Sequence, residues 1–101
     1  MDVNFELGEW KFVWDSDKDE LNWRKHKVRF EDAARIFLDE YRYDDFDELH
    51  SNFEDRIKTV GFVRNVLAVI YTERDDRNRI ISARKATNRE EQRYYEQFRK
   101  K

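Results

Sequence analysis

The sequence contains no cysteine and no proline, and it has only two glycines among its 101 residues. Without cysteine, the chain has no disulfide framework, no thiolate zinc site and no cysteine nucleophile. No apolar run approaches the roughly 20 residues that span a bilayer, and the first ten residues lack a secretory pattern. The expected location is therefore the cytoplasm. Because no proline- or glycine-rich linker interrupts the chain, we expect a single domain over residues 1–101.

Aromatic residues and charges are abundant instead. Eight Phe, five Tyr and three Trp make up 16% of the chain, and 44% of the residues are charged. Aromatic side chains bury a large area each, so they predict a folded chain despite the high charge. Residues 74–101 hold ten Lys and Arg against five Asp and Glu, which leaves −7 for the rest of a chain of net charge −2. A basic C-terminal third thus adjoins an acidic body.

The N-terminal half shows one strand pattern and two helix patterns. Residues 10–14 alternate large apolar side chains, which predicts a strand. Asp17 and Glu20 have the spacing of a capping box, which predicts a helix through about His26. A second helix is predicted from apolar residues at helical spacing: Phe30, Ala33, Ala34, Phe37 and Leu38.

The C-terminal half predicts strands and a last helix. The acidic stretch 39–55 indicates an edge strand or loop, and strands follow at 56–63, 66–72 and 78–84. The stretch 66–72 is apolar on both faces, as expected of a central strand. Thr87 and Glu90 form a capping box that opens the C-terminal helix. The expected fold is α+β, in the order β-α-α-β-β-β-β-α, with an antiparallel sheet and helices on one face.

The segment 77–91 concentrates cations between and beside apolar residues. Strict alternation along a strand would place Arg79, Ile81 and Ala83 on one face and Ile80 and Arg84 on the other. Arg56 and Lys58 share a face of the neighbouring predicted strand. Such guanidinium and ammonium groups suit phosphate binding, and the segment is therefore interpreted as part of an RNA-binding face. Ordinary pairing with nearby Asp and Glu is the alternative.

Only two side chains, His26 and His50, titrate near neutrality without perturbation, and either can act as a general base or acid. The alternative for each is an ordinary helix-end or surface histidine. The carboxylates of residues 44–50 have a spacing that breaks the EF-hand pattern at the required glycine. No metal or other cofactor is therefore expected.

Several motifs resemble the BrnT family, which are ribonucleases of bacterial toxin–antitoxin systems. The most specific motifs are KHKVRFEDAARIF (25–37), EDRI (54–57) and YTERDDRNRIISARKAT (71–87). The resemblance extends from Trp14 to about Tyr95. It implies a RelE-like fold, with a small antiparallel sheet, two N-terminal helices and one C-terminal helix. Two family glycines are replaced here, by Lys27 after the KH pair and by Asp75 in the ERDDR turn.

The resemblance also implies metal-independent cleavage of RNA. In that reaction a base takes the proton of a 2′-hydroxyl, cations stabilise the phosphorane, and an acid protonates the leaving 5′-oxygen. The catalytic candidates are Arg56, Arg84, His26, His50 and Lys25. The substrate-binding candidates are Arg79, Lys58 and Tyr71, where Tyr71 or another exposed aromatic would stack on a base.

The resemblance implies a protein partner as well. BrnT toxins are neutralised by a BrnA antitoxin, a DNA-binding protein of ribbon-helix-helix type, so this chain is not expected to contact DNA or a membrane itself. The acidic stretch 39–55 is a candidate surface for a basic partner segment. The alternative function is a non-catalytic interaction module that has kept the fold and the partner surface.

Overall fold

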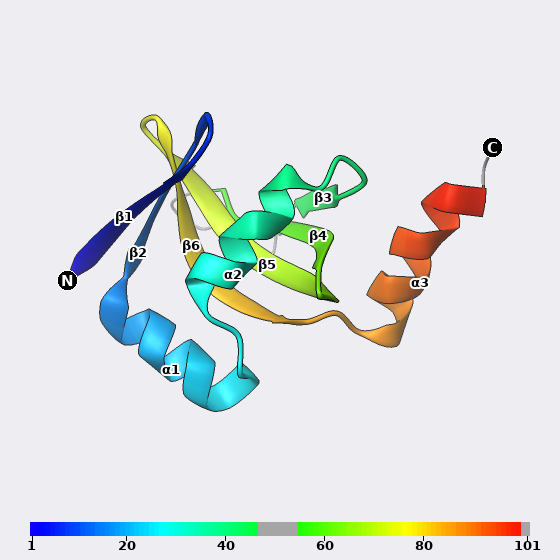
Figure 1. The fold of residues 1–101 in the computed structure, drawn as a ribbon, viewed down its shortest axis with the longest axis horizontal. Coiled ribbons are helices and arrows are strands. Elements are labelled where there is room, and N and C mark those ends of the chain that lie inside the picture. The colour runs from blue at the N-terminus through cyan, green and yellow to red at the C-terminus, as the bar shows by residue number, and fades with distance from the viewer. Residues whose placement is uncertain (47–54, 100–101) are drawn as a thin grey trace.

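A computed structural model describes residues 1–46 and 55–99 of the chain. Six strands form one mixed sheet in the order β1-β2-β6-β5-β4-β3 (Figure 1). Neighbouring strands are antiparallel except β2 and β6, which are parallel. The strands are β1 (Asp2–Leu7), β2 (Trp10–Asp15), β3 (Tyr43–Phe46), β4 (Ile57–Val63), β5 (Asn65–Arg74) and β6 (Arg77–Lys85).

Helices cover both faces of this sheet. The helical elements are α1 (Ser16–His26), α2 (Phe30–Ala34), the 3₁₀ turn η1 (Arg35–Leu38), α3 (Asn88–Glu96) and the 3₁₀ turn η3 (Gln97–Arg99). α1 and α2 pack on β6 and η1 packs on β4, whereas α3 packs on β4 and β5. In Figure 1, α3 lies at the opposite end of the molecule from β1.

The α+β class is confirmed, but the predicted order and sheet are wrong in three respects. A first strand, β1, was missed, so the two early helices follow a β-hairpin and are not N-terminal. The parallel pairing of β2 with β6 makes the sheet mixed, not antiparallel. Helices lie on two faces instead of one, since the apolar residues of β5 face both ways and each face needs cover.

Two buried clusters mark the two faces. On the face under α1 and α2, the cluster contains the buried side chains Phe12, Trp14, Phe30, Phe37, Val69, Ile80 and Ala83, among others. On the other face, Val60, Val66 and Ala68 pack against Tyr94 of α3. The stretch 66–72, as predicted, is apolar on both faces of an interior strand.

The helix starts show where local signals succeed and fail. The box of Thr87 and Glu90 is present at α3, with the Thr87 side chain bonded to the Glu90 amide and the Glu90 side chain bonded back. The predicted box of Asp17 and Glu20 is wrong: Asp15 caps α1 by accepting a bond from the Asp17 amide at 3.2 Å. Asp15 ends β2 in an extended conformation, so the strand delivers the cap directly.

The second helix is shorter than its pattern predicted. α2 ends at Ala34 and continues as the 3₁₀ turn η1. A 3₁₀ turn has three residues per turn, so side chains rotate further around the axis at each step than in an α-helix. Leu38 consequently leaves the apolar stripe and is exposed, whereas Phe30, Ala33, Ala34 and Phe37 are buried.

The two residues that replace family glycines, Lys27 and Asp75, have the left-handed backbone conformation that glycine favours. Lys27 ends α1 with φ 58° and its amide donates to the Trp23 carbonyl at 2.9 Å. Asp75, in the turn between β5 and β6, has φ 56°, and Arg64 between β4 and β5 has φ 62°. The left-handed caps are therefore retained at the cost of some strain.

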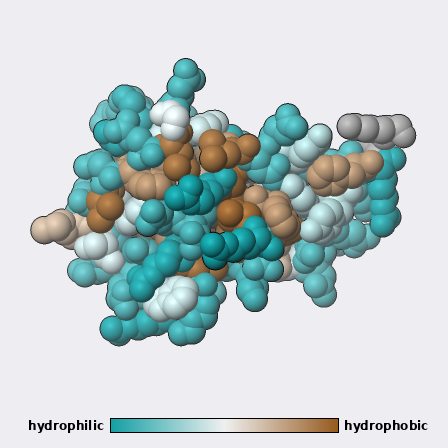
Figure 2. All heavy atoms as spheres, in the orientation of Figure 1, coloured by the Kyte–Doolittle hydropathy of each residue, from teal (hydrophilic) through white to brown (hydrophobic). Residues whose placement is uncertain are grey.

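No helix in the described part of the chain is long and apolar enough to cross a membrane. In Figure 2, hydrophobic residues are scattered among hydrophilic ones on the face shown.

Candidate active site

A register shift in β6 determines which of its side chains reach the face of the sheet on which α3 packs. Ile70 pairs with Ser82 but Tyr71 pairs with Ile80, so Ile81 is an extra residue. Ile80 and Ala83 consequently both lie in the cluster under α1 and α2, contrary to the strict alternation predicted from sequence. Bulges often re-aim side chains beside functional sites.

The re-aimed side chains line a groove of about 450 Å³ on the face opposite α1. Its floor is apolar, with Ile70 and Ile81, and three cations surround it: Arg56, Lys58 and Arg84. The other lining residues are Asp45 and Phe46 from the edge strand β3, and Ser82. The groove thus brings together cations from positions as far apart in sequence as 56 and 84.

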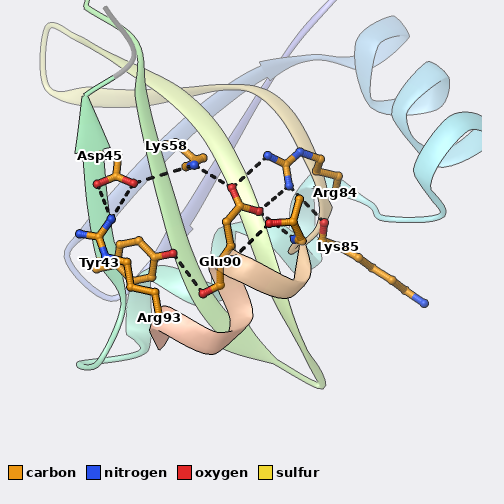
Figure 3. Close-up of polar contacts among 8 residues, drawn as sticks. Tyr43, Asp45, Lys58, Arg84, Lys85, Glu90 and Arg93 are labelled. Atoms are coloured by element: carbon orange, nitrogen blue, oxygen red, sulfur yellow. Dashed lines mark hydrogen bonds and ion pairs between the residues drawn. The ribbon is translucent and has the colours of Figure 1, made fainter. Parts of the chain in front are cut away.

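Glu90 of α3 is bonded to two of these cations (Figure 3). Its carboxylate accepts from Arg84 Nη1 at 2.7 Å and Nη2 at 3.1 Å, and it lies 2.7 Å from Lys58 Nζ. The side chain is 9% exposed. Burial alone raises the pKa of Glu90, but the bonds from Arg84, Lys58 and the Thr87 amide outweigh it and lower the pKa to about 2.

Arg84 keeps donors for a further ligand. Its guanidinium has five N–H groups, and within the described residues it makes two bonds to Glu90 and one, at 3.3 Å, to the Lys85 carbonyl. Two N–H groups remain, and the side chain is 36% exposed. Glu90 therefore fixes the orientation of the guanidinium without using all of its donors.

A second set of contacts holds α3 against the edge strand. Arg93 Nη1 contacts both carboxylate oxygens of Asp45, at 2.9 and 3.0 Å, and its guanidinium lies 4.1 Å from the centre of the Tyr43 ring. The Tyr43 hydroxyl donates to the Glu90 carbonyl at 3.1 Å. Asp45 also lies 3.9 Å from Lys58. Carboxylates from two elements thus offset part of the positive charge of the groove.

The remaining candidates lie elsewhere. Lys25 and His26 end α1 and are not among the residues that line the groove. Arg79 donates to Asp2 of β1 at 3.2 Å. Tyr71 is only 5% exposed, which leaves no room for a base to stack on it, and burial raises its pKa to about 12.

His50 lies outside the described residues. In the sequence it stands between Phe46 and Arg56, both of which line the groove.

Sequence reasoning missed two residues of the groove region. Glu90 was assigned to a helix cap alone, although a buried carboxylate at that position also faces the neighbouring strands. Phe46 is 54% exposed and lines the groove, and an exposed aromatic residue on a short acidic edge strand is the signal that could have found it.

The fold and the groove define a class: small α+β proteins that carry a cation-lined groove on one face of a mixed sheet. The model of the family described as ribonuclease toxin, BrnT, of type II toxin–antitoxin systems matches residues 14–90. That range covers more than half of the chain and includes every groove residue named above. The chain belongs to the BrnT family.

A solved structure agrees with this assignment at the level of fold. The crystal structure of the Brucella abortus ribonuclease toxin BrnT superposes with a TM-score of 0.56 at 24% identity, covering 74% of this chain and 94% of that one. The curated proteins contain no significant match.

Proposed function

We propose that the chain is a metal-independent endoribonuclease toxin, and that the groove between β3, β4 and β6 is its active site. The supporting observation is that Arg56, Lys58 and Arg84 line one accessible groove. The family is one of ribonuclease toxins, which makes RNA the substrate class. In a cell, cleavage of RNA would arrest translation.

In this proposal the three cations bind the scissile phosphate. The two remaining N–H groups of Arg84 donate to two phosphate oxygens, while Lys58 supplies a compact positive charge. As the 2′-oxygen attacks, negative charge grows on the non-bridging oxygens of the phosphorane. The three cations stabilise the transition state, which carries this charge, more than they stabilise the ground state. This difference accelerates the reaction.

Proton transfer requires groups that titrate nearer neutrality than an arginine. One group must accept the 2′-hydroxyl proton and another must protonate the 5′-oxygen as the P–O bond breaks. The candidates remain His50, His26 and Lys25. Among them His50 is favoured, because it is the one that stands in sequence between two groove-lining residues.

Phe46 takes the base-stacking role in this proposal. Phe46 is exposed and lines the same groove as Ile70 and Ile81, so we expect a base next to the scissile phosphate to stack on it while the phosphate contacts the cations. We therefore propose Phe46 instead of Tyr71 as the aromatic contact.

We further propose that a BrnA-type antitoxin of ribbon-helix-helix type neutralises the chain. Type II systems pair a protein toxin with a protein antitoxin, so the family itself implies a protein partner. A test is co-purification of the chain with the product of an adjacent small reading frame. A neighbouring reading frame that encodes no partner able to restore growth would argue against this assignment.

The second candidate function is a non-catalytic interaction module. The observation that favours it is that Glu90 already pairs with both Lys58 and Arg84 and offsets part of the positive charge offered to a phosphate. The two functions differ in one measurable respect. An enzyme slows growth by destroying transcripts, whereas a module that only binds leaves transcripts intact.

Induced expression without a partner tests the proposed enzyme. We expect growth arrest with loss of intact transcripts, and relief of both by the double variant Arg56→Ala, Arg84→Ala. The matched control is Arg24→Ala, Arg35→Ala, which removes two exposed arginines that lie outside the groove and pair with Glu20 and Glu31, four residues before them. Arrest that persists in the first double variant would exclude these arginines from the mechanism.

The role of His50 has its own test. His50→Gln should lower the cleavage rate and remove one limb of the pH–rate profile, whereas His26→Gln should leave the profile unchanged. The opposite result would assign proton transfer to the end of α1.

A further inference from the structure

A second hollow lies on the same face of the sheet, beyond the point where α3 packs. It measures about 170 Å³, and its walls include Phe62 and Arg64 near the β4–β5 turn, Lys85 at the end of β6, and Glu91 and Tyr95 of α3. Phe62 lies four residues from Lys58 on the same face of β4, which corresponds to about 13 Å along a strand. The N-terminus of α3 separates this hollow from the groove.

The cations of this hollow have no ion-pair partner among the described residues, unlike Lys58 and Arg84. Within residues 1–46 and 55–99, neither Arg64 nor Lys85 has a carboxylate at ion-pair distance, and both side chains are exposed. Figure 3 shows Lys85 extending away from the ion-pair cluster around Glu90.

An adjoining hollow of about 150 Å³ shares Arg64 and Lys85 and adds Lys27 at the end of α1. The carboxylates that line the two hollows are Asp32 and Glu91, so three cations face two acids. The end of the sheet therefore carries positive charge available to an anion.

Two aromatic rings stand beside these cations. Phe62 is 46% exposed and Tyr95 is 43% exposed. Tyr95 is supported from behind by the rings of Tyr94 and Phe98, at centroid distances of 5.3 and 6.3 Å. Cations interleaved with accessible rings are the pattern by which proteins hold single-stranded nucleic acid, with phosphates on the cations and bases on the rings.

We propose that this hollow is a second RNA subsite, which binds an unpaired nucleotide flanking the one cleaved in the groove. A base stacks on Phe62 or Tyr95, and its neighbouring phosphates contact Arg64 and Lys85. The RNA strand would pass from this hollow to the groove along residues 85–89, since Lys85 directly follows Arg84. The inference rests on the proposed function for the identity of the ligand, but the subsite itself binds and does not cleave.

An acidic protein segment is the other ligand that free cations could attract. The exposed rings favour RNA, because a segment rich in Asp and Glu makes no use of a flat aromatic surface, whereas every base has a face that stacks.

Binding of a fluorescein-labelled single-stranded RNA 12-mer, followed by anisotropy over a range of salt concentrations, tests the subsite. Arg64→Gln with Lys85→Gln should weaken binding and lower the slope of log K against log salt by about 1.4, because each phosphate contact on a single strand contributes about 0.7. The matched control is Lys18→Gln with Arg24→Gln, which makes the same change in net charge outside both hollows. The control should leave the slope near the wild-type value.

Phe62→Leu tests stacking separately from charge. It should weaken binding by about fivefold or more with no change in salt slope. Leu38→Ala, at an apolar side chain that is 59% exposed and lies outside the hollow, is the control and should bind as the wild type does.

The outcomes separate the subsite from the catalytic proposal. Wild type that binds the 12-mer with these variant effects but leaves it uncleaved would overturn the proposed enzyme and keep the subsite. Equal RNA affinity and salt slope for the wild type and Arg64→Gln, Lys85→Gln would overturn the subsite. So would a variant that loses affinity only for a polyglutamate peptide, since the hollow would then be a site for an acidic protein segment.

Discussion

Replacing Glu90 with glutamine removes the shared partner of two cations while keeping the size of the side chain. In the wild type this carboxylate is 9% exposed, contacts Arg84 and Lys58, and completes the capping box with Thr87. Glutamine keeps one acceptor oxygen, but it removes the carboxylate charge paired with Arg84 and leaves Lys58 with Asp45, at 3.9 Å, as its counter-charge. We therefore expect Glu90→Gln to fold with reduced stability.

The lowered pKa of Glu90 sets the size of the effect. The pKa is about 2 in the folded protein against an ordinary value of 4.5, and each unit corresponds to about 1.4 kcal/mol. The charged form therefore contributes about 3 kcal/mol. Because the folded pKa is the lower one, this contribution is complete above the unfolded pKa, and it falls below about 0.5 kcal/mol as the pH drops to about 2.

Urea denaturation of both proteins at several pH values measures this difference. At pH 7 the free energy of unfolding of Glu90→Gln should be about 3 kcal/mol lower, and the gap should close between about pH 4.5 and pH 2. Glu91→Gln is the matched control, because it makes the same change on the next residue, which is exposed. A gap that stays constant from pH 7 to pH 2 would refute the claim that the cations hold Glu90 ionised.

Three further substitutions test how the sheet and helices are joined. Asn22→Ala should lower the free energy of unfolding by about 3 kcal/mol, because Asn22 bonds the carbonyls of Val28 and Ala83 and the amide of Ala83, and all three would lose their partner. Gly61→Ala should cost about 1–2 kcal/mol, since an added Cβ would lie 3.1 Å from the Cβ of Ile36. Lys27→Gly should raise stability by about 0.5–1 kcal/mol by relieving a φ of 58°. Urea midpoints measure all three, and unchanged midpoints would contradict the packing described.

Elements whose structure is determined within a single segment could be predicted from the sequence. The box of Thr87 and Glu90 opened a helix because both partners lie within one turn. The apolar run at 66–72 predicted an interior strand because apolar side chains on both faces need two covered faces. The same kind of signal was present for β1, where Val3, Phe5 and Leu7 alternate before the turn at Gly8, and it was overlooked.

Contacts between distant segments were not predictable in the same way. No signal within β2 predicts that it pairs in parallel with β6, with Phe12 opposite Asn78. The extra residue at Ile81 depends on the register between β5 and β6, and strict alternation therefore assigned Ala83 to the wrong face. A helix cap similarly gave no hint that Glu90 also holds two cations of the groove.

The candidate site was predicted in part through the family resemblance. Arg56 and Arg84 came from different motifs, and the structure places both on the groove wall with Lys58. The resemblance did not indicate that α3 would bring a carboxylate to two of these cations, because that contact depends on how the helix packs on β4 and β5.

Incubation of purified protein with RNA in the presence of EDTA tests the central claim most directly. The account predicts fragments that end in a 2′,3′-cyclic phosphate, and a rate reduced about 100-fold or more in Arg56→Ala, Arg84→Ala. RNA that stays intact with the folded wild type, or equal cleavage by the double variant, would contradict the assignment of the groove as an active site.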